Sequence, residues 1–116
     1  MAYVDGFVLA VPEEKKEAYR DMARAAAQVY RDHGALQVVE CWGDDVPDGE
    51  TISFRRAVKA EDGEVVLFSW IVWPSREARD TGNEAVMNDP RIQQSMTAPF
   101  DPQRMICGGF DVLLDV

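Results

Sequence analysis

The sequence predicts an α+β protein of the ferredoxin-like type, with the order strand, helix, strand, strand, helix, strand. The first observation is the uncharged run Val-Val-Leu-Phe-Ser-Trp-Ile-Val-Trp at residues 65–73, whose β-branched and aromatic residues favour a strand. The second is helical amphipathic patterning in residues 12–33 and 75–88, between the strand-like segments. We therefore expect a four-stranded antiparallel sheet with both helices on one face.

Length and charge limit the classes of protein. A chain of 116 residues is the size of one domain, so residues 1–116 are expected to form a single unit. The net charge is −9 and no basic stripe is present, which argues against nucleic acid as a partner. No apolar run is long enough to span a membrane, and the N-terminus lacks the features of a secretory signal. We expect a cytoplasmic protein without a membrane partner.

Residues 3–33 have the pattern of a strand followed by a long helix. Residues 3–11 alternate between two apolar faces, and Pro12 suits the first turn of a helix that ends near His33, before Gly34. One stripe of this helix can cover a sheet: Tyr19, Met22, Ala23, Ala26, Val29 and Tyr30.

Three further segments have extended patterns. Residues 36–42 form a second strand, and residues 105–116 form the last one. Residues 51–58 have a weaker extended pattern than these two segments. They are interpreted as a strand continuation or a ribbon before a turn at Asp62-Gly63.

The second helix has a weaker pattern than the first. Ser75 is its expected N-cap, Ala78, Ala85 and Val86 face inward, and Gly82 lowers its intrinsic stability. A short helix restarts after Asp89-Pro90, with Ile92 and Met96 inward.

The central strand, residues 65–73, is apolar on both faces, but the two helices can cover only one. A bare apolar sheet face on a small protein indicates a partner surface. The simplest partner is a second copy of the chain, packed sheet against sheet, so we expect a homodimer.

Several blocks of the sequence also carry a family resemblance. These blocks are Tyr3-Val4-Asp5-Gly6-Phe7-Val8, His33-Gly34-Ala35-Leu36, Asp44-Asp45-Val46-Pro47, Phe68-Ser69-Trp70-Ile71-Val72, Pro99-Phe100-Asp101, Arg104-Met105-Ile106 and Gly108-Gly109-Phe110. Together they resemble the YbaA-like family, small bacterial proteins of unknown function. The resemblance covers nearly the whole chain and implies a dimeric α+β barrel. Its wider superfamily includes cofactor-free monooxygenases, haem-degrading enzymes and stress-response dimers, and it supplies no catalytic residues to transfer.

Residues that could bind a metal or form a disulfide are few. Cys41 and Cys107 each lie in an apolar run and are interpreted as buried reduced thiols rather than a disulfide. His33, the only histidine, is expected to cap a helix end. The acidic residues 44–50 depart from the spacing of a calcium loop and are interpreted as a solvated turn. We expect no cofactor, and folding without metal, haem or disulfide.

Tryptophan and arginine supply the candidate ligand-binding residues: Arg55, Trp70, Trp73 and Arg104. Aromatic rings with a few cations can line a small-molecule pocket between sheet and helices. Trp70 is expected to pack above Ala23 and Ala26 of the first helix. The alternative interpretation of the same residues is a packed core with salt-bridged edges.

Three functions remain open at this point. The first is binding of a small apolar or anionic ligand in a pocket between sheet and helices. The second is a non-catalytic dimeric stress-response or protein-interaction module. The third is a cofactor-free enzyme that resembles the monooxygenases.

Overall fold

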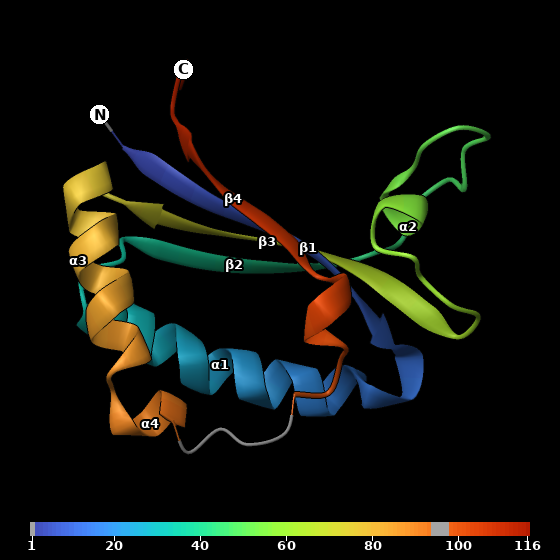
Figure 1. Ribbon diagram of the computed structural model, residues 1–116, viewed down its shortest axis with the longest axis horizontal. Helices are drawn as coiled ribbons and strands as arrows, with labels where there is room; N and C mark the ends of the chain where they lie inside the picture. The colour runs from blue at the N-terminus through green and yellow to red at the C-terminus, as the bar shows by residue number, and fades with distance from the viewer. Residues whose placement is uncertain (1, 94–97) are drawn as a thin grey trace.

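A computed structural model describes residues 2–93 and 98–116 (Figure 1). The elements are β1 (Tyr3–Pro12), η1 (Glu13–Lys15), α1 (Lys16–Asp32), β2 (Gln37–Trp42), α2 (Phe54–Ala57), β3 (Glu64–Trp73), α3 (Arg76–Met87), α4 (Pro90–Gln93), η2 (Pro102–Arg104) and β4 (Ile106–Asp111). The four strands and two long helices follow the predicted order. None of the described helices has the length and apolar character needed to cross a membrane.

The sheet is antiparallel, with the strand order β2-β3-β1-β4. β1 pairs with β3 in the register Gly6↔Trp70 and with β4 in the register Gly6↔Gly108. The two long helices, α1 and α3, lie on the same side of the sheet (Figure 1). The predicted α+β class with a ferredoxin-like order is thereby confirmed.

The core lies between the sheet and the helices. In one cluster, Tyr19 of α1 packs against strand residues Leu9, Val11 and Leu67. In a second, Tyr3, Ala35, Ile71 and Trp73 pack together, and the Tyr30 ring meets Trp73 edge-on with the centroids 6.2 Å apart.

The Trp73 ring reaches α3 at Gly82. A Cβ atom built on Gly82 would lie 2.2 Å from Cζ3 of Trp73 and 2.9 Å from the carbonyl oxygen of His33. The glycine that weakens the helix pattern therefore makes room for a fully buried indole.

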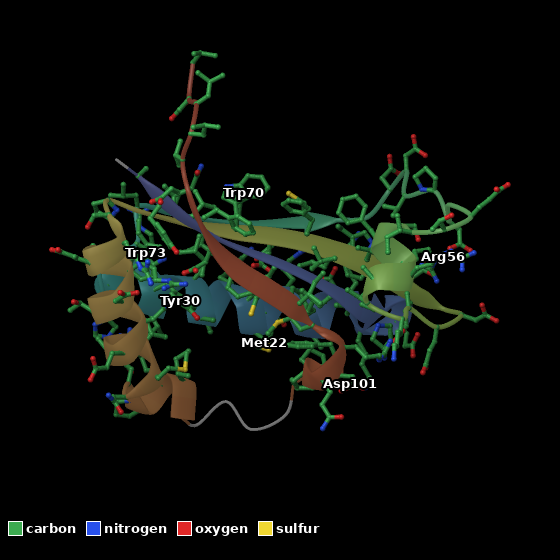
Figure 2. The ribbon with its side chains drawn as sticks, turned by 45° about the horizontal axis from the view of Figure 1, so that its top comes forward. Met22, Tyr30, Arg56, Trp70, Trp73 and Asp101 are labelled. Atoms are coloured by element: carbon green, nitrogen blue, oxygen red, sulfur yellow. The ribbon has the colours of Figure 1, made fainter. Side chains whose placement is uncertain are left out.

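Trp70 points away from the helices, so its predicted packing above Ala23 and Ala26 is wrong. Figure 2 shows Trp70 on the opposite side of the sheet from Tyr30 and Met22. Its ring packs edge-on against Phe68, with centroids 5.7 Å apart. Side chains alternate along a strand, and the inward set of β3 is Leu67, Ser69, Ile71 and Trp73. Because β3 is apolar on both faces, its own pattern could not identify the covered face.

Residues 51–58 do not continue a strand, contrary to the prediction. They contain the single-turn helix α2, whose N-cap Ser53 accepts a hydrogen bond from the Arg56 amide. Val58 follows α2 and packs with Ala10 and Val66 on the side of the sheet away from α1. Local capping and one buried apolar residue thus hold this segment without a strand partner.

Two predicted boundaries also differ. Pro12 ends β1 rather than opening the helix, and α1 starts at Lys16 after the turn η1. β4 ends at Asp111 and not at residue 116, because Asp111 pairs with Tyr3, the first residue of β1. Beyond that pair one more backbone hydrogen bond follows, from the Val112 amide to the Ala2 carbonyl at 3.3 Å, and then the two segments part. Met96, predicted to face inward, lies outside the described residues.

The cysteines and the histidine differ in surroundings from the prediction. Cys107 is exposed and Cys41 half-buried, because both lie on the edge strands β4 and β2, and both thiols are free. His33 is the C-cap residue of α1, but its ring contacts Asp89, with Nε2 2.9 Å from Oδ2, instead of capping carbonyls.

The side of the sheet away from α1 and α3, the free face, is strongly apolar. Phe68, Ile106 and Phe110 are 41%, 46% and 61% exposed there. They border a shallow hollow of about 260 Å³ together with Gly6, Val8 and Gly108. α2 and Val58 cover only one end of this face.

Candidate ligand-binding cleft

The structure separates the four ligand-binding residues expected from the sequence. Arg104 makes a bidentate pair with Glu64, at 2.7 and 2.8 Å, and Arg55 donates to the Glu64 carbonyl at 2.8 Å. These contacts hold both guanidinium groups at the start of β3. Trp70 lies on the free face, and Trp73 is buried at the opposite end of β3. The four residues do not line one common cavity in the described part of the chain, and their ligand-binding role stays a prediction.

A buried carboxylate near Trp73 was not among the expected site residues. Asp5 is 5% exposed and accepts hydrogen bonds from Trp73 Nε1 at 3.1 Å and Arg79 Nε at 3.0 Å. The Arg79 guanidinium also lies 5.0 Å from the centre of the Tyr3 ring. Its pKa is raised, first by the hydrogen bond to Asp80 and then by Asp5. Asp5 lies outside the lining of the cleft, so we assign this network to the attachment of α3 to the sheet. An acid at an inward position of the first strand was the available sequence signal.

A cleft lies between α1 and the edge of the sheet. Its outer part has a volume of about 290 Å³ and is lined by Lys16, Tyr19, Arg20, Ala23, Arg24, Ala27, Val38, Glu40, Trp42 and Leu67. Ala23 and Ala27 leave space because they are small. β2 is an edge strand, so the cleft can be reached from the side of the sheet.

A second hollow of about 120 Å³, the inner chamber, adjoins the outer cleft over the central strands β1 and β3 and is likewise open to solvent. The two hollows share five lining residues, namely Tyr19, Ala23, Ala27, Val38 and Glu40. Apolar side chains of β1, α1, β2 and β3 form most of the inner chamber, and Phe100 and Met105 complete its lining. The Ser69 hydroxyl group, on a residue that is 4% exposed, adds a polar group to the sheet side.

A hydrogen bond joins α1 and β2 between the two hollows. The Tyr19 hydroxyl group donates to Oε1 of Glu40 at 2.5 Å. Burial raises the pKa of Tyr19, and the hydrogen bond and negative charge of Glu40 raise it further. Burial likewise raises the pKa of Tyr30, helped by the charges of Asp5 and Glu40. Both tyrosines are therefore neutral at physiological pH, and neither is poised to act as a phenolate base.

Cations line the mouth of the cleft. Lys16, Arg20 and Arg24 are spaced four residues apart on α1 and so form one row on its surface. Nζ of Lys16 lies 5.2 Å from the centre of the Trp42 ring, and Arg20 pairs with Glu17 at 3.1 Å. Among the residues that the structure describes, Glu40 is the single acid in the lining of the outer cleft.

The sequence pattern contained part of this site. Glu40 lies on the strand face that also carries Val38 and Trp42, so an acid among apolar residues of one face was the available signal. The cations of α1 give no such signal, because helical spacing does not reveal the strand beside them. In the residues that the structure describes, no group of three or more His, Cys, Asp or Glu side chains is placed to hold a metal ion.

The fold and the cleft define a ferredoxin-like α+β protein with a ligand-sized opening between its long helix and its sheet. The structure of Rv0793 from Mycobacterium tuberculosis has a similar fold, with a TM-score of 0.54 at 14% identity over 99% of this chain and 98% of that one. The chain belongs to the family described as protein of unknown function (DUF1428), whose model matches residues 2–102. It is 55% identical to the uncharacterized protein YbaA of Escherichia coli K12 over 99% of both chains. It has the same identity to YbaA of Shigella flexneri.

Proposed function

We propose that the protein binds a small, largely apolar molecule in the cleft between α1 and the sheet. The observation that carries the proposal is the adjoining pair of hollows, about 290 and 120 Å³, which share the Tyr19–Glu40 hydrogen bond. Binding sites for small molecules are typically concave, apolar and supplied with a few oriented polar groups. Ala23 and Ala27 provide the space, and Tyr19, Glu40 and Ser69 provide the polar groups.

We also propose that two copies associate through the free face. Exposed Phe68, Ile106 and Phe110 form an apolar surface of the kind that monomers rarely present to water. A second copy can cover it by packing its own free face in a two-fold arrangement, because such an interface uses the same surface twice. Two free thiols are compatible with a reducing compartment, and we place this dimer in the cytoplasm.

The non-catalytic interaction module is the second candidate function, and the exposed free face is the observation that favours it. It predicts that this face binds a different protein while the cleft stays empty. The monooxygenase-like alternative would need the cleft to hold a substrate first. Binding is the step common to the first and third functions, so we test it directly.

The test uses a panel of hexanol, benzyl alcohol, octanoate and octylamine, followed by amide NMR shifts and Trp42 fluorescence. Ala23→Leu should fill the cleft and abolish the response, because residue 23 lines both hollows. Ala25→Leu is the matched control, since residue 25 is exposed on the same helix. If no panel member shifts cleft resonances, or if Ala23→Leu binds like the parent, the binding proposal is wrong.

The test of the dimer is light scattering after size exclusion. Phe110→Glu should convert a dimer to a monomer, because it places a charge on the free face. Leu36→Glu is the control, since Leu36 is 53% exposed, lies just before the edge strand β2, and is outside the lining of the hollow on the free face. A parent protein that is monomeric at all concentrations would contradict the proposed dimer.

A further inference from the structure

We infer that the ligand of the cleft is a monocarboxylate with an apolar tail, its head at the cation row Lys16, Arg20 and Arg24 and its tail in the inner chamber. This inference rests on the proposed binding function and specifies the chemical class of the ligand.

The charges at the mouth favour an anion. In the described part of the chain, three cations and one carboxylate line the outer cleft, although the whole chain carries a net charge of −9. A local positive region on an acidic protein concentrates small anions near it. Arg24 has no ion pair with another described residue, and Lys16 contacts an aromatic ring rather than an acid. Both groups can therefore pair with an incoming carboxylate.

The acid in the cleft does not oppose this arrangement. Oε1 of Glu40 already accepts the Tyr19 hydroxyl proton in a 2.5 Å hydrogen bond. Glu40 also lines the inner chamber as well as the outer cleft, whereas the three cations line only the outer cleft. A carboxylate head at the mouth meets the cations, whereas a second anionic group beside the tail would meet the negative charge of Glu40, which lines both hollows. The arrangement thus selects a single charge at one end of the ligand.

The inner chamber selects an apolar tail. Phe7, Leu9 and Ile71 lie on its sheet side, and Met22 and Ala26 lie on its helix side. Burying apolar surface there favours binding in proportion to the area removed from water, before the costs of association are subtracted. A short acid such as acetate can contact the cation row but gains none of this burial. Head and tail are therefore both required for appreciable affinity.

The experiment compares octanoate, octanol, octylamine and acetate by calorimetry on the intact protein. Octanoate should bind more tightly than octanol and octylamine, and acetate should give no measurable heat. Raising the salt concentration should weaken the binding of octanoate and leave the binding of octanol nearly unchanged, because only the charged head group is screened. Arg20→Gln combined with Arg24→Gln should weaken octanoate roughly tenfold, with octanol affected less than about twofold.

The matched control combines Lys15→Gln with Arg76→Gln, which lowers the net charge equally at two exposed positions outside the cleft. This control should bind octanoate like the parent. The inferred head group is wrong, while the binding function stands, if octanoate, octanol and octylamine bind with equal affinity. The same conclusion follows if both double variants lose the same share of their affinity for octanoate. If none of the four compounds binds, the proposed function and this inference both fail.

Discussion

Gly82→Ala is expected to destabilise the protein, although helix propensity alone predicts the opposite. Replacing glycine by alanine inside a helix normally stabilises it by about 1 kcal/mol. Here the new methyl group would lie 2.2 and 2.6 Å from Cζ3 and Cη2 of Trp73, and 2.9 Å from the carbonyl oxygen of His33. Real carbon atoms do not approach that closely, so either α3 or the indole must move.

Neither of these neighbours can move freely. Trp73 is fully buried and its Nε1 donates to Asp5, while the His33 oxygen belongs to the backbone at the end of α1. Overpacking of a well-packed core costs about 1–3 kcal/mol, and larger values accompany rigid surroundings. After the gain in helix propensity, we expect Gly82→Ala to lower the free energy of unfolding by about 1–2 kcal/mol.

Urea denaturation followed by far-UV circular dichroism measures this change. Thr81→Ala is the control, because residue 81 is exposed on the same helix and should be nearly neutral. In a Trp73→Phe background the clashing six-membered ring of the indole is gone, so the cost of Gly82→Ala should shrink or reverse. If the Gly82→Ala protein is as stable as the parent, Gly82 does not provide the space that the Trp73 ring occupies.

Two further predictions concern β3. Hydrogen bonding to Arg104 lowers the pKa of Glu64 below its ordinary value of 4.5. The pair therefore stabilises the fold above pH 4.5. This stabilisation is lost as the pH falls through the lower pKa of the folded state. Glu64→Gln should therefore reduce stability at pH 7 and flatten its acid-side decline in pH-dependent urea titrations; an unchanged decline would argue against this role. Trp70→Ala should cost about 1–2 kcal/mol in protomer stability, less than the 3–5 kcal/mol of a buried ring, and should weaken self-association in light scattering. A loss at the top of the larger range with unaltered assembly would contradict the position of Trp70 on the free face.

The order of the elements could be predicted because it depends on local patterns. The apolar run of β3 and the helical stripe that contains Tyr19 and Val29 each repeat with a period that one type of secondary structure satisfies. Alternation along β1 likewise places Asp5 on one face with Tyr3 and Leu9. Such groupings follow from backbone geometry alone and need no knowledge of distant residues.

Boundaries and short elements depended on partners far along the chain. β4 stops at Asp111 because β1 begins at Tyr3, and nothing in the apolar residues 112–114 indicates this end. Residues 51–58 looked extended, but the Ser53 cap and the burial of Val58 beside Ala10 produce a helical turn. Tertiary packing therefore decided these elements against their local pattern.

By itself, the sequence determined the class of fold, the residues that share each face of a strand, and the spacing of Lys16, Arg20 and Arg24 on one helix. Only the tertiary structure decided that the helices cover the Trp73 side of β3 and leave Trp70 on the free face. It also decided that Arg55 and Arg104 converge on Glu64, and that the cation row of α1 borders a cleft. The physical reason is that side-chain periodicity reports on one element at a time, whereas a cleft is a property of the space between two.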